Sequence, residues 1–106
     1  MKVLLDEMLP AAVAGLLPDL AVVTVRTAGY TGLLNGELMR RAVADGYDVL
    51  VTADRNLPAQ QNVTASGIAV VLVRGSRMAD IEPQAARIGA AVAEVRPGTV
   101  TRVESG

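Results

Sequence analysis

Short apolar runs alternate along the chain with longer segments in which apolar residues recur every three or four positions. The apolar runs are rich in valine and leucine and predict five strands, at residues 2–5, 21–25, 48–52, 68–73 and 99–103. Helical periodicity predicts helices over residues 9–20, 35–46 and 81–95. Strands that alternate with helices need crossover connections, so the pattern predicts an α/β fold with a mainly parallel sheet and helices on both faces.

The segments between these elements are short, and no linker or repeat divides the chain, so residues 1–106 are expected to form a single domain. Residues 26–35, RTAGYTGLLN, predict an exposed and mobile loop. Asn35 at its end is a suitable N-cap for the helix that follows. Residues 57–66 predict a loop or a short helix, and the last strand is expected at an edge of the sheet.

Composition restricts the chemistry that the chain can perform. Without Cys or His it has no thiolate nucleophile, no Ser-His-Asp triad and no zinc site of the usual kind. With Tyr30 and Tyr47 as its only aromatic residues, an aromatic platform for stacked bases is not expected. Catalysis would therefore depend on carboxylates, Arg, Ser, Thr or Tyr with a borrowed metal. The absence of Cys fits a cytoplasmic protein, and no apolar stretch reaches the length of a membrane span.

Two aspartates follow buried strands directly: Asp6 follows the first strand and Asp54 the third. Carboxyl ends of parallel strands share one edge of a sheet, where ligands bind in such folds, so the two side chains are expected to lie close together. Two carboxylates at close range repel unless a cation lies between them, and hard oxygen ligands point to Mg²⁺ or Mn²⁺. Glu37 opens the second helix, whose start we expect at the opposite edge of the sheet. It would meet the two aspartates only through its long side chain or through a steeply crossing helix.

Each of these residues also has a structural interpretation. Asp6 could cap the helix that follows, Asp54 could form an Asx-turn, and Glu37 could pair with Arg41 at i,i+4. Other polar side chains near the strand ends could bind a phosphate or orient a substrate, or they could be solvated surface and satisfy loop backbone. The candidates for substrate binding are Arg26, Arg55, Asn56, Gln60 and Gln61, with Arg74 and Arg77 as further cations.

Three segments, VLLDEMLP, VVTVRTAGYTGLLNGELM and YDVLVTADRNLPAQQN, together resemble the short branch of the PIN-like nuclease superfamily. Members of this branch are domains of unknown function or toxins of toxin–antitoxin pairs. The resemblance implies a three-layer α/β/α sandwich whose acids hold Mg²⁺ or Mn²⁺ for hydrolysis of RNA. It implies that Asp6, Asp54 and Glu37 are the catalytic residues and metal ligands. The partners that it implies are an RNA substrate, a cognate antitoxin and a second copy of the chain.

The chain departs from the family pattern at two positions of the site. Asn35 stands where the family has Asp, and Met8 stands where the family motif DENLP has an amide. An endoribonuclease is therefore one expectation, and the alternative is a catalytically degenerate PIN-like module that binds a protein or RNA without cleaving it. A phospho-receiver domain has a similar order of acids but needs a lysine after a later strand, and Lys2 is the only lysine.

Overall fold

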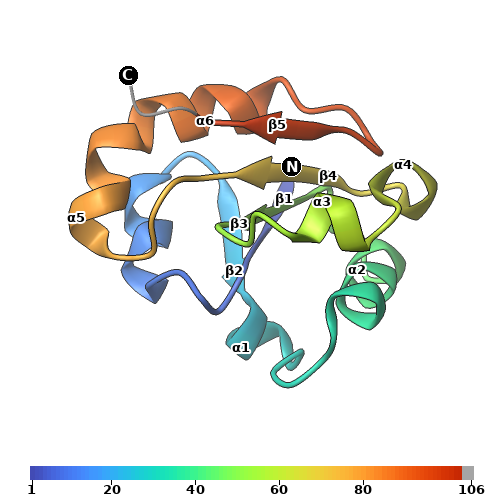
Figure 1. Cartoon of the computed structure of the whole chain (residues 1–106). Helices are drawn as coiled ribbons and strands as arrows, with labels where there is room; N and C mark the ends of the chain where they lie inside the picture. Colours follow the sequence, from blue (N-terminus) through green and yellow to red (C-terminus); the bar gives the residue numbers. More distant parts are fainter. Residues whose placement is uncertain (104–106) are drawn as a thin grey trace.

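The computed structural model describes residues 1–103 and contains one five-stranded sheet in which every pair of neighbouring strands is parallel (Figure 1). The strand order is β2-β1-β3-β4-β5, so β5 lies at an edge as the sequence predicts. The strands are β1 (Lys2–Leu5), β2 (Ala21–Thr24), β3 (Val49–Thr52), β4 (Ala69–Leu72) and β5 (Val100–Arg102). The predicted α/β fold with a parallel sheet is confirmed.

Strands β1, β3 and β4 are buried on both faces because successive apolar side chains point to opposite sides of the sheet. In β1, Val3 and Leu5 belong to one core, and Leu4 belongs to the other. The same alternation in β3 places Val51 in the first core and Leu50 in the second. A continuous apolar run in the sequence therefore builds two cores, one on each face.

Helices cover both of these faces, with α6 and α2 on opposite sides of the sheet (Figure 1). The first core is closed by η1 (Ala11–Leu16), α5 (Met78–Ile81) and α6 (Ala85–Ala93), and η2 (Glu82–Gln84) joins α5 to α6. The second core is closed by α1 (Val25–Ala28), α2 (Asn35–Ala44), α3 (Leu57–Gln60) and α4 (Val63–Ser66). Among residues 1–103, no helix is long and apolar enough to cross a bilayer.

The helix predicted over residues 9–20 is shorter and tighter than expected. Only Ala11–Leu16 is helical, and it is a 3-10 helix that starts after Pro10. Gly15 and Pro18 both disfavour a continued α-helix, so the segment closes with i→i+3 bonds such as Leu17 N–H to the Ala14 carbonyl, 3.2 Å. Leu9, Val13 and Leu17 still reach the core. The helix predicted over 81–95 is likewise divided, into α5, η2 and α6, with Pro83 in the first turn of η2.

The loop predicted over residues 26–35 is more ordered than its glycines suggest. Val25–Ala28 forms the one-turn helix α1, capped by Thr24, whose Oγ1 accepts a hydrogen bond from Thr27 N–H at 3.0 Å. Tyr30 is buried, with 2% of its surface exposed, so the prediction of a wholly exposed loop is wrong. The N-cap of α2 is Leu34 and not Asn35. Residues 57–66 contain the two short helices α3 and α4, which agrees with the expectation for that segment.

The order of the strands identifies where a ligand would bind. Sequence neighbours β1 and β2 lie side by side on one side of the sheet, whereas β3 pairs with the other side of β1. The order in which strands are added to the sheet therefore reverses between β1 and β3. In doubly wound sheets, ligands usually bind in the crevice at the carboxyl ends of the strands where this reversal occurs. Such folds host unrelated functions, so the position of a site does not reveal its chemistry.

Tyr30 forms a buried polar contact near the amino edge of the sheet, and its removal gives a first prediction. The hydroxyl donates a hydrogen bond to the Asp45 carboxylate, and the ring packs edge-on against Tyr47 at 6.1 Å between centroids. Burial, followed by this hydrogen bond, raises the pKa of Tyr30 to about 12. Tyr30→Phe is expected to cost about 1–2 kcal/mol at pH 7 because the donor is lost.

The same variant also tests the pH dependence. Because the folded pKa of Tyr30 lies above the ordinary value of 10.0, its stabilisation is complete below about pH 10 and is lost as pH rises towards 12. Tyr30→Phe is therefore expected to lose less stability over this range than the unmodified chain, as measured by urea midpoints. Tyr47→Phe is the control at pH 7, because no Tyr47 hydroxyl hydrogen bond is found within residues 1–103. Equal midpoints for Tyr30→Phe and the unmodified chain at pH 7 would contradict the predicted stabilisation.

Candidate functional site

Asp6 and Asp54 lie at the carboxyl ends of β1 and β3, where the strand order reverses. The β1–β3 pairing extends to Asp6, whose N–H donates to the Val51 carbonyl at 2.9 Å. Asp54 follows the last residue of β3 by two positions. Both aspartates are half-buried. The sequence therefore placed the two acids at one edge of the sheet correctly.

Thr52 connects the two aspartates. Its Oγ1 donates a hydrogen bond to Asp6 Oδ2 at 2.6 Å and accepts one from the Asp54 N–H at 3.1 Å. Thr52 is the last residue of β3, and none of its surface is exposed. A hydrogen bond to a carboxylate inside the protein is strong and directional, so the buried hydroxyl orients the Asp6 carboxylate and also holds the backbone of Asp54. Sequence reasoning did not assign Thr52 to the site, although a polar residue at the end of a fully buried strand was the available signal.

The Asp54 carboxylate accepts two hydrogen bonds of its own. Oδ1 accepts from the Asn56 N–H at 3.0 Å, and Oδ2 accepts from Asn35 Nδ2 at 3.1 Å. The first of these bonds is the Asx-turn that was an alternative interpretation of Asp54, and it is present. Asp54 is therefore held in a fixed orientation, and it both shapes the turn and contributes a carboxylate to the site.

Asp6 is not a helix cap. The first helical turn starts after Pro10 and has no side-chain cap, and Asp6 accepts the Leu9 N–H through its backbone carbonyl. Its Oδ2 is engaged by Thr52, whereas its Oδ1 accepts no hydrogen bond from residues 1–103. Asp6 thus offers one carboxylate oxygen to a ligand.

Asn35 corrects the expected position of the second helix. We expected the start of this helix and the end of the following strand at opposite edges, but Asn35 at the start of α2 reaches Asp54 beyond the end of β3. The reason is the crossover itself. The helix runs antiparallel to the strands, so it begins at the carboxyl edge from which the preceding strand exits. Asn35 is therefore at the site, where it supplies a neutral amide.

Glu37 lies two residues further along α2 and pairs with a different residue from the one considered above. Its Oε2 accepts a hydrogen bond from Arg40 Nη2 at 2.6 Å, an i,i+3 pair, and not from Arg41. The Glu37 side chain is 43% exposed, so this pair contributes only a few tenths of a kcal/mol. Within residues 1–103, no group of three or more acidic side chains is arranged to hold a metal. In this arrangement the carboxylates of the site are those of Asp6 and Asp54.

The candidate substrate-binding residues are spread over several positions. Arg55 and Asn56 are exposed and follow Asp54 directly. Arg26 lines a hollow of about 420 Å³ together with Glu7, at the carboxyl ends of β1 and β2. Gln60 is exposed at the end of α3, and Gln61 lines a smaller hollow of about 230 Å³ beside the start of α2. The structure thus places Arg55 and Asn56 directly after Asp54, whereas Arg26 and Gln61 border two separate hollows.

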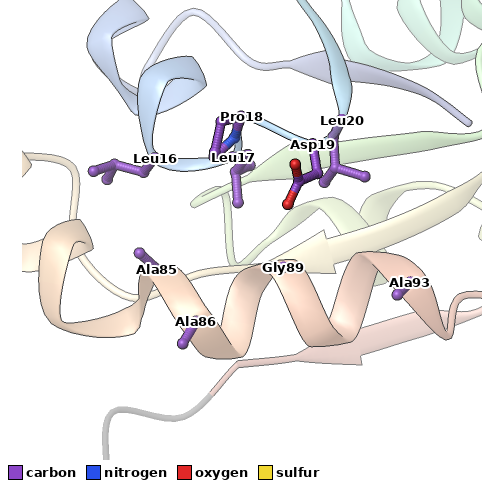
Figure 2. A pocket seen from close by; sticks show the side chains of 9 residues that line it. All are labelled: Leu16, Leu17, Pro18, Asp19, Leu20, Ala85, Ala86, Gly89 and Ala93. Atoms are coloured by element: carbon purple, nitrogen blue, oxygen red, sulfur yellow. The ribbon is translucent and has the colours of Figure 1, made fainter.

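A third hollow, of about 370 Å³, lies between α6 and the segment that joins η1 to β2 (Figure 2). Leu16, Leu17 and Leu20 line it on one side and small residues of α6 line it on the other, and Asp19 is the one charged residue among those that line it (Figure 2). It belongs to the side of the sheet that η1 and α6 cover. A largely apolar hollow of this kind lacks the converging polar groups that a catalytic site requires.

Comparison with known proteins does not identify the chain: no family model, no curated protein and no solved structure matches it. The fold and the site define an α/β protein with an all-parallel sheet and a carboxylate pair at the reversal of strand order. The PIN-like resemblance therefore rests on the motifs of the sequence.

The donor set at this edge suits a hard divalent cation. Asp6 and Asp54 supply carboxylate oxygens, and Mg²⁺ commonly uses one or two carboxylates while it keeps several water ligands. An Asp6 oxygen without a hydrogen bond from residues 1–103 is a suitable ligand atom. The residues present thus fit Mg²⁺ or Mn²⁺.

Proposed function

We propose that the chain is a PIN-like, metal-dependent ribonuclease that hydrolyses RNA phosphodiesters at Asp6 and Asp54. The observation that carries the proposal is the connection of these two acids through the single buried hydroxyl of Thr52. The motifs VLLDEMLP and VLVTADRN support the same function. A five-stranded parallel sheet with helices on both faces is compatible with the sandwich that the resemblance implies.

Asp6 would hold a Mg²⁺ or Mn²⁺ ion through Oδ1, and Asp54 would hold it beside the adjacent strand. A divalent ion bound there would lower the pKa of a water molecule and would stabilise negative charge on a phosphate. Thr52 keeps Asp6 Oδ2 occupied and so selects the oxygen that remains for the ion. Arg55, exposed directly after Asp54, would neutralise the charge of the bound phosphate. Glu37 would become a metal ligand only after its ion pair with Arg40 is broken.

The biological role that we infer for this activity is that of the toxin in a toxin–antitoxin pair. The support is the motif resemblance, which also implies a cognate antitoxin and a second copy of the chain as partners. An antitoxin that silences the enzyme by occupying the site would present an arginine or an acidic tail near Asp6 and Asp54, because an arginine pairs with carboxylates and an acid competes for the cation.

The second candidate is a catalytically degenerate PIN-like module that binds an RNA or a protein without cleavage. The observations that favour it are the two hydrogen bonds already made by the Asp54 carboxylate and the ion pair that occupies Glu37. Asn35 in place of a carboxylate also lowers the negative charge of the site. A binding module of this kind need not respond to a divalent metal, and this difference separates the two candidates.

Asp54→Asn provides the test, because an asparagine can keep both hydrogen bonds once the Asn35 amide rotates. In EDTA the variant is expected to melt at or above the temperature of the unmodified chain, since neutralisation removes repulsion from Asp6. Mn²⁺ at about ten times its Kd should stabilise the unmodified chain by roughly 1.4 kcal/mol and the variant far less. Single-stranded RNA should be cleaved in Mn²⁺ and not in EDTA.

Melting curves and gel assays of the two proteins decide between the candidates. A variant that is destabilised in EDTA and responds to Mn²⁺ like the unmodified chain would show that Asp54 is purely structural. An unmodified chain that neither responds to Mn²⁺ nor cleaves RNA would favour the degenerate module.

A further inference from the structure

The loop after β4 carries two arginines at the carboxyl edge of the sheet. Residues 74–77, the RGSR loop, are all exposed. In the β3–β4 pairing Thr52 lies opposite Leu72, and the Val73 N–H donates to the Thr52 carbonyl at 2.9 Å. The RGSR loop therefore leaves the sheet beside the residues that lead from Thr52 to Asp54. The loop thus begins at the edge of the sheet where the proposed site lies, on the side of β4.

The Gln84 side chain holds the backbone of Arg74, the first residue of this loop, through hydrogen bonds. Its side chain is buried, with 1% of the residue exposed, and it makes three hydrogen bonds. Nε2 donates to the Arg74 carbonyl and to the Asp80 carbonyl, both at 2.7 Å, and Oε1 accepts from the Arg74 N–H at 3.2 Å. The amide thus binds both backbone groups of Arg74 and ties them to the start of the following helical segment. Buried and satisfied amides of this kind make a loop rigid.

Asp80 fixes the other end of the loop. Its Oδ2 accepts from the Arg77 N–H at 3.2 Å and from Arg77 Nε at 3.4 Å. These bonds, the backbone bond first, lower the pKa of Asp80. Gly75 has φ of +81°, and a Cβ there would lie 2.4 Å from the Asp80 Cβ, so only glycine fits against the acid. The Arg77 side chain is oriented through Nε and is 81% exposed.

We propose that the RGSR loop is a preformed phosphate-binding arm that holds the RNA backbone beside Asp54, and that Gln84 is the residue that positions this arm. The proposal rests on the proposed function and adds the path of the substrate to it. Asp6 and Asp54 repel a polyanion, so an RNA strand needs fixed cations next to them. Arginine binds phosphate through its planar fork, and a loop already held in shape loses less entropy when it binds. Rigid support beneath two exposed arginines is therefore suited to this task.

The test measures binding of a fluorescein-labelled oligouridine of about 12 nucleotides in EDTA, where cleavage does not interfere. Arg74→Gln and Arg77→Gln are each expected to weaken binding about 3–10-fold and to lower the slope of log Kd against log salt by about 0.7. Arg96→Gln is the matched control, because Arg96 lies in the exposed turn before β5, at the amino edge of the sheet. It should change neither quantity by a comparable amount.

A double-variant cycle tests the role of Gln84. Gln84→Leu should weaken binding of the same oligouridine in the unmodified chain but not in the Arg74→Gln, Arg77→Gln background, because it acts only through the arm. A purely structural Gln84 would give the same loss in both backgrounds, and that result would overturn its positioning role. Both arginine variants change exposed side chains, and glutamine at position 77 keeps the backbone N–H bond to Asp80 and loses only the Nε bond, so the variants test the arm even if Gln84→Leu folds poorly.

The outcomes separate the arm from the proposed function. If the unmodified chain cleaves RNA in Mn²⁺ while both arginine variants bind with the affinity and salt slope of Arg96→Gln, the arm is wrong and the ribonuclease proposal stands. If the unmodified chain neither binds nor cleaves RNA, the proposed function fails and the arm fails with it.

Discussion

Asp6→Asn is expected to lower metal-dependent cleavage of single-stranded RNA by roughly 100-fold or more. Of the two aspartates, the substitution removes the charge from the one that keeps a carboxylate oxygen without a hydrogen bond from residues 1–103. A weaker ligand lowers the occupancy of the metal and displaces the water that it activates. The loss corresponds to at least about 2.7 kcal/mol of transition-state stabilisation. Initial rates at saturating Mn²⁺, with Asp6→Asn and the unmodified chain purified in parallel, measure it.

The fold should survive this change because asparagine can still accept the Thr52 hydrogen bond. Asp19→Asn is the matched control: it is the same chemical substitution, at an exposed residue in the turn before β2, at the opposite edge of the sheet. It should leave the rate unchanged. Cleavage by Asp6→Asn at the rate of the unmodified chain, in a preparation free of other nucleases, would end the proposed mechanism.

Thr52→Val is expected to destabilise the fold by about 2–4 kcal/mol. Valine has nearly the shape of threonine but lacks the hydroxyl that donates to Asp6 and accepts from the Asp54 N–H. A hydrogen bond to a charged group contributes about 1.5–3 kcal/mol, and the Asp54 N–H loses its acceptor as well. For a domain of this size the loss amounts to a fall in Tm on the order of 10 °C. Thermal melts in EDTA measure it without any contribution from a metal.

Thr52→Ser separates the hydroxyl from the packing of the same side chain. Serine keeps both hydrogen bonds and loses one buried methyl group, which costs about 1 kcal/mol. The serine variant should therefore be more stable than the valine variant and should retain RNA cleavage. The opposite order of stability would mean that Thr52 matters for packing and not as the connection between the two aspartates.

The apolar pattern was sufficient to predict the fold because burial in a parallel sheet imposes it directly. A strand that packs helices on both faces must be apolar at consecutive positions, as Val49 to Val51 are, and this run is visible in the sequence. The pattern did not predict which type of helix the backbone forms. Residues 9–20 have helical spacing, but Gly15 and Pro18 leave a 3-10 helix there.

The sequence by itself determined that Asp6 and Asp54 share an edge of the sheet, because parallel strands end on the same side and each acid follows a buried strand. Only the tertiary structure decided how the acids are held. Hydrogen bonds between residues far apart in the chain depend on side-chain direction, which sequence spacing does not reveal. Thr52 reaches Asp6 across 46 positions and Asn35 reaches Asp54 across 19, and Gln84 is buried beneath a loop ten residues before it. The partner of Glu37 also depends on side-chain direction. Arg40 and Arg41 both follow Glu37 at helical spacing, and in the structure Glu37 pairs with Arg40.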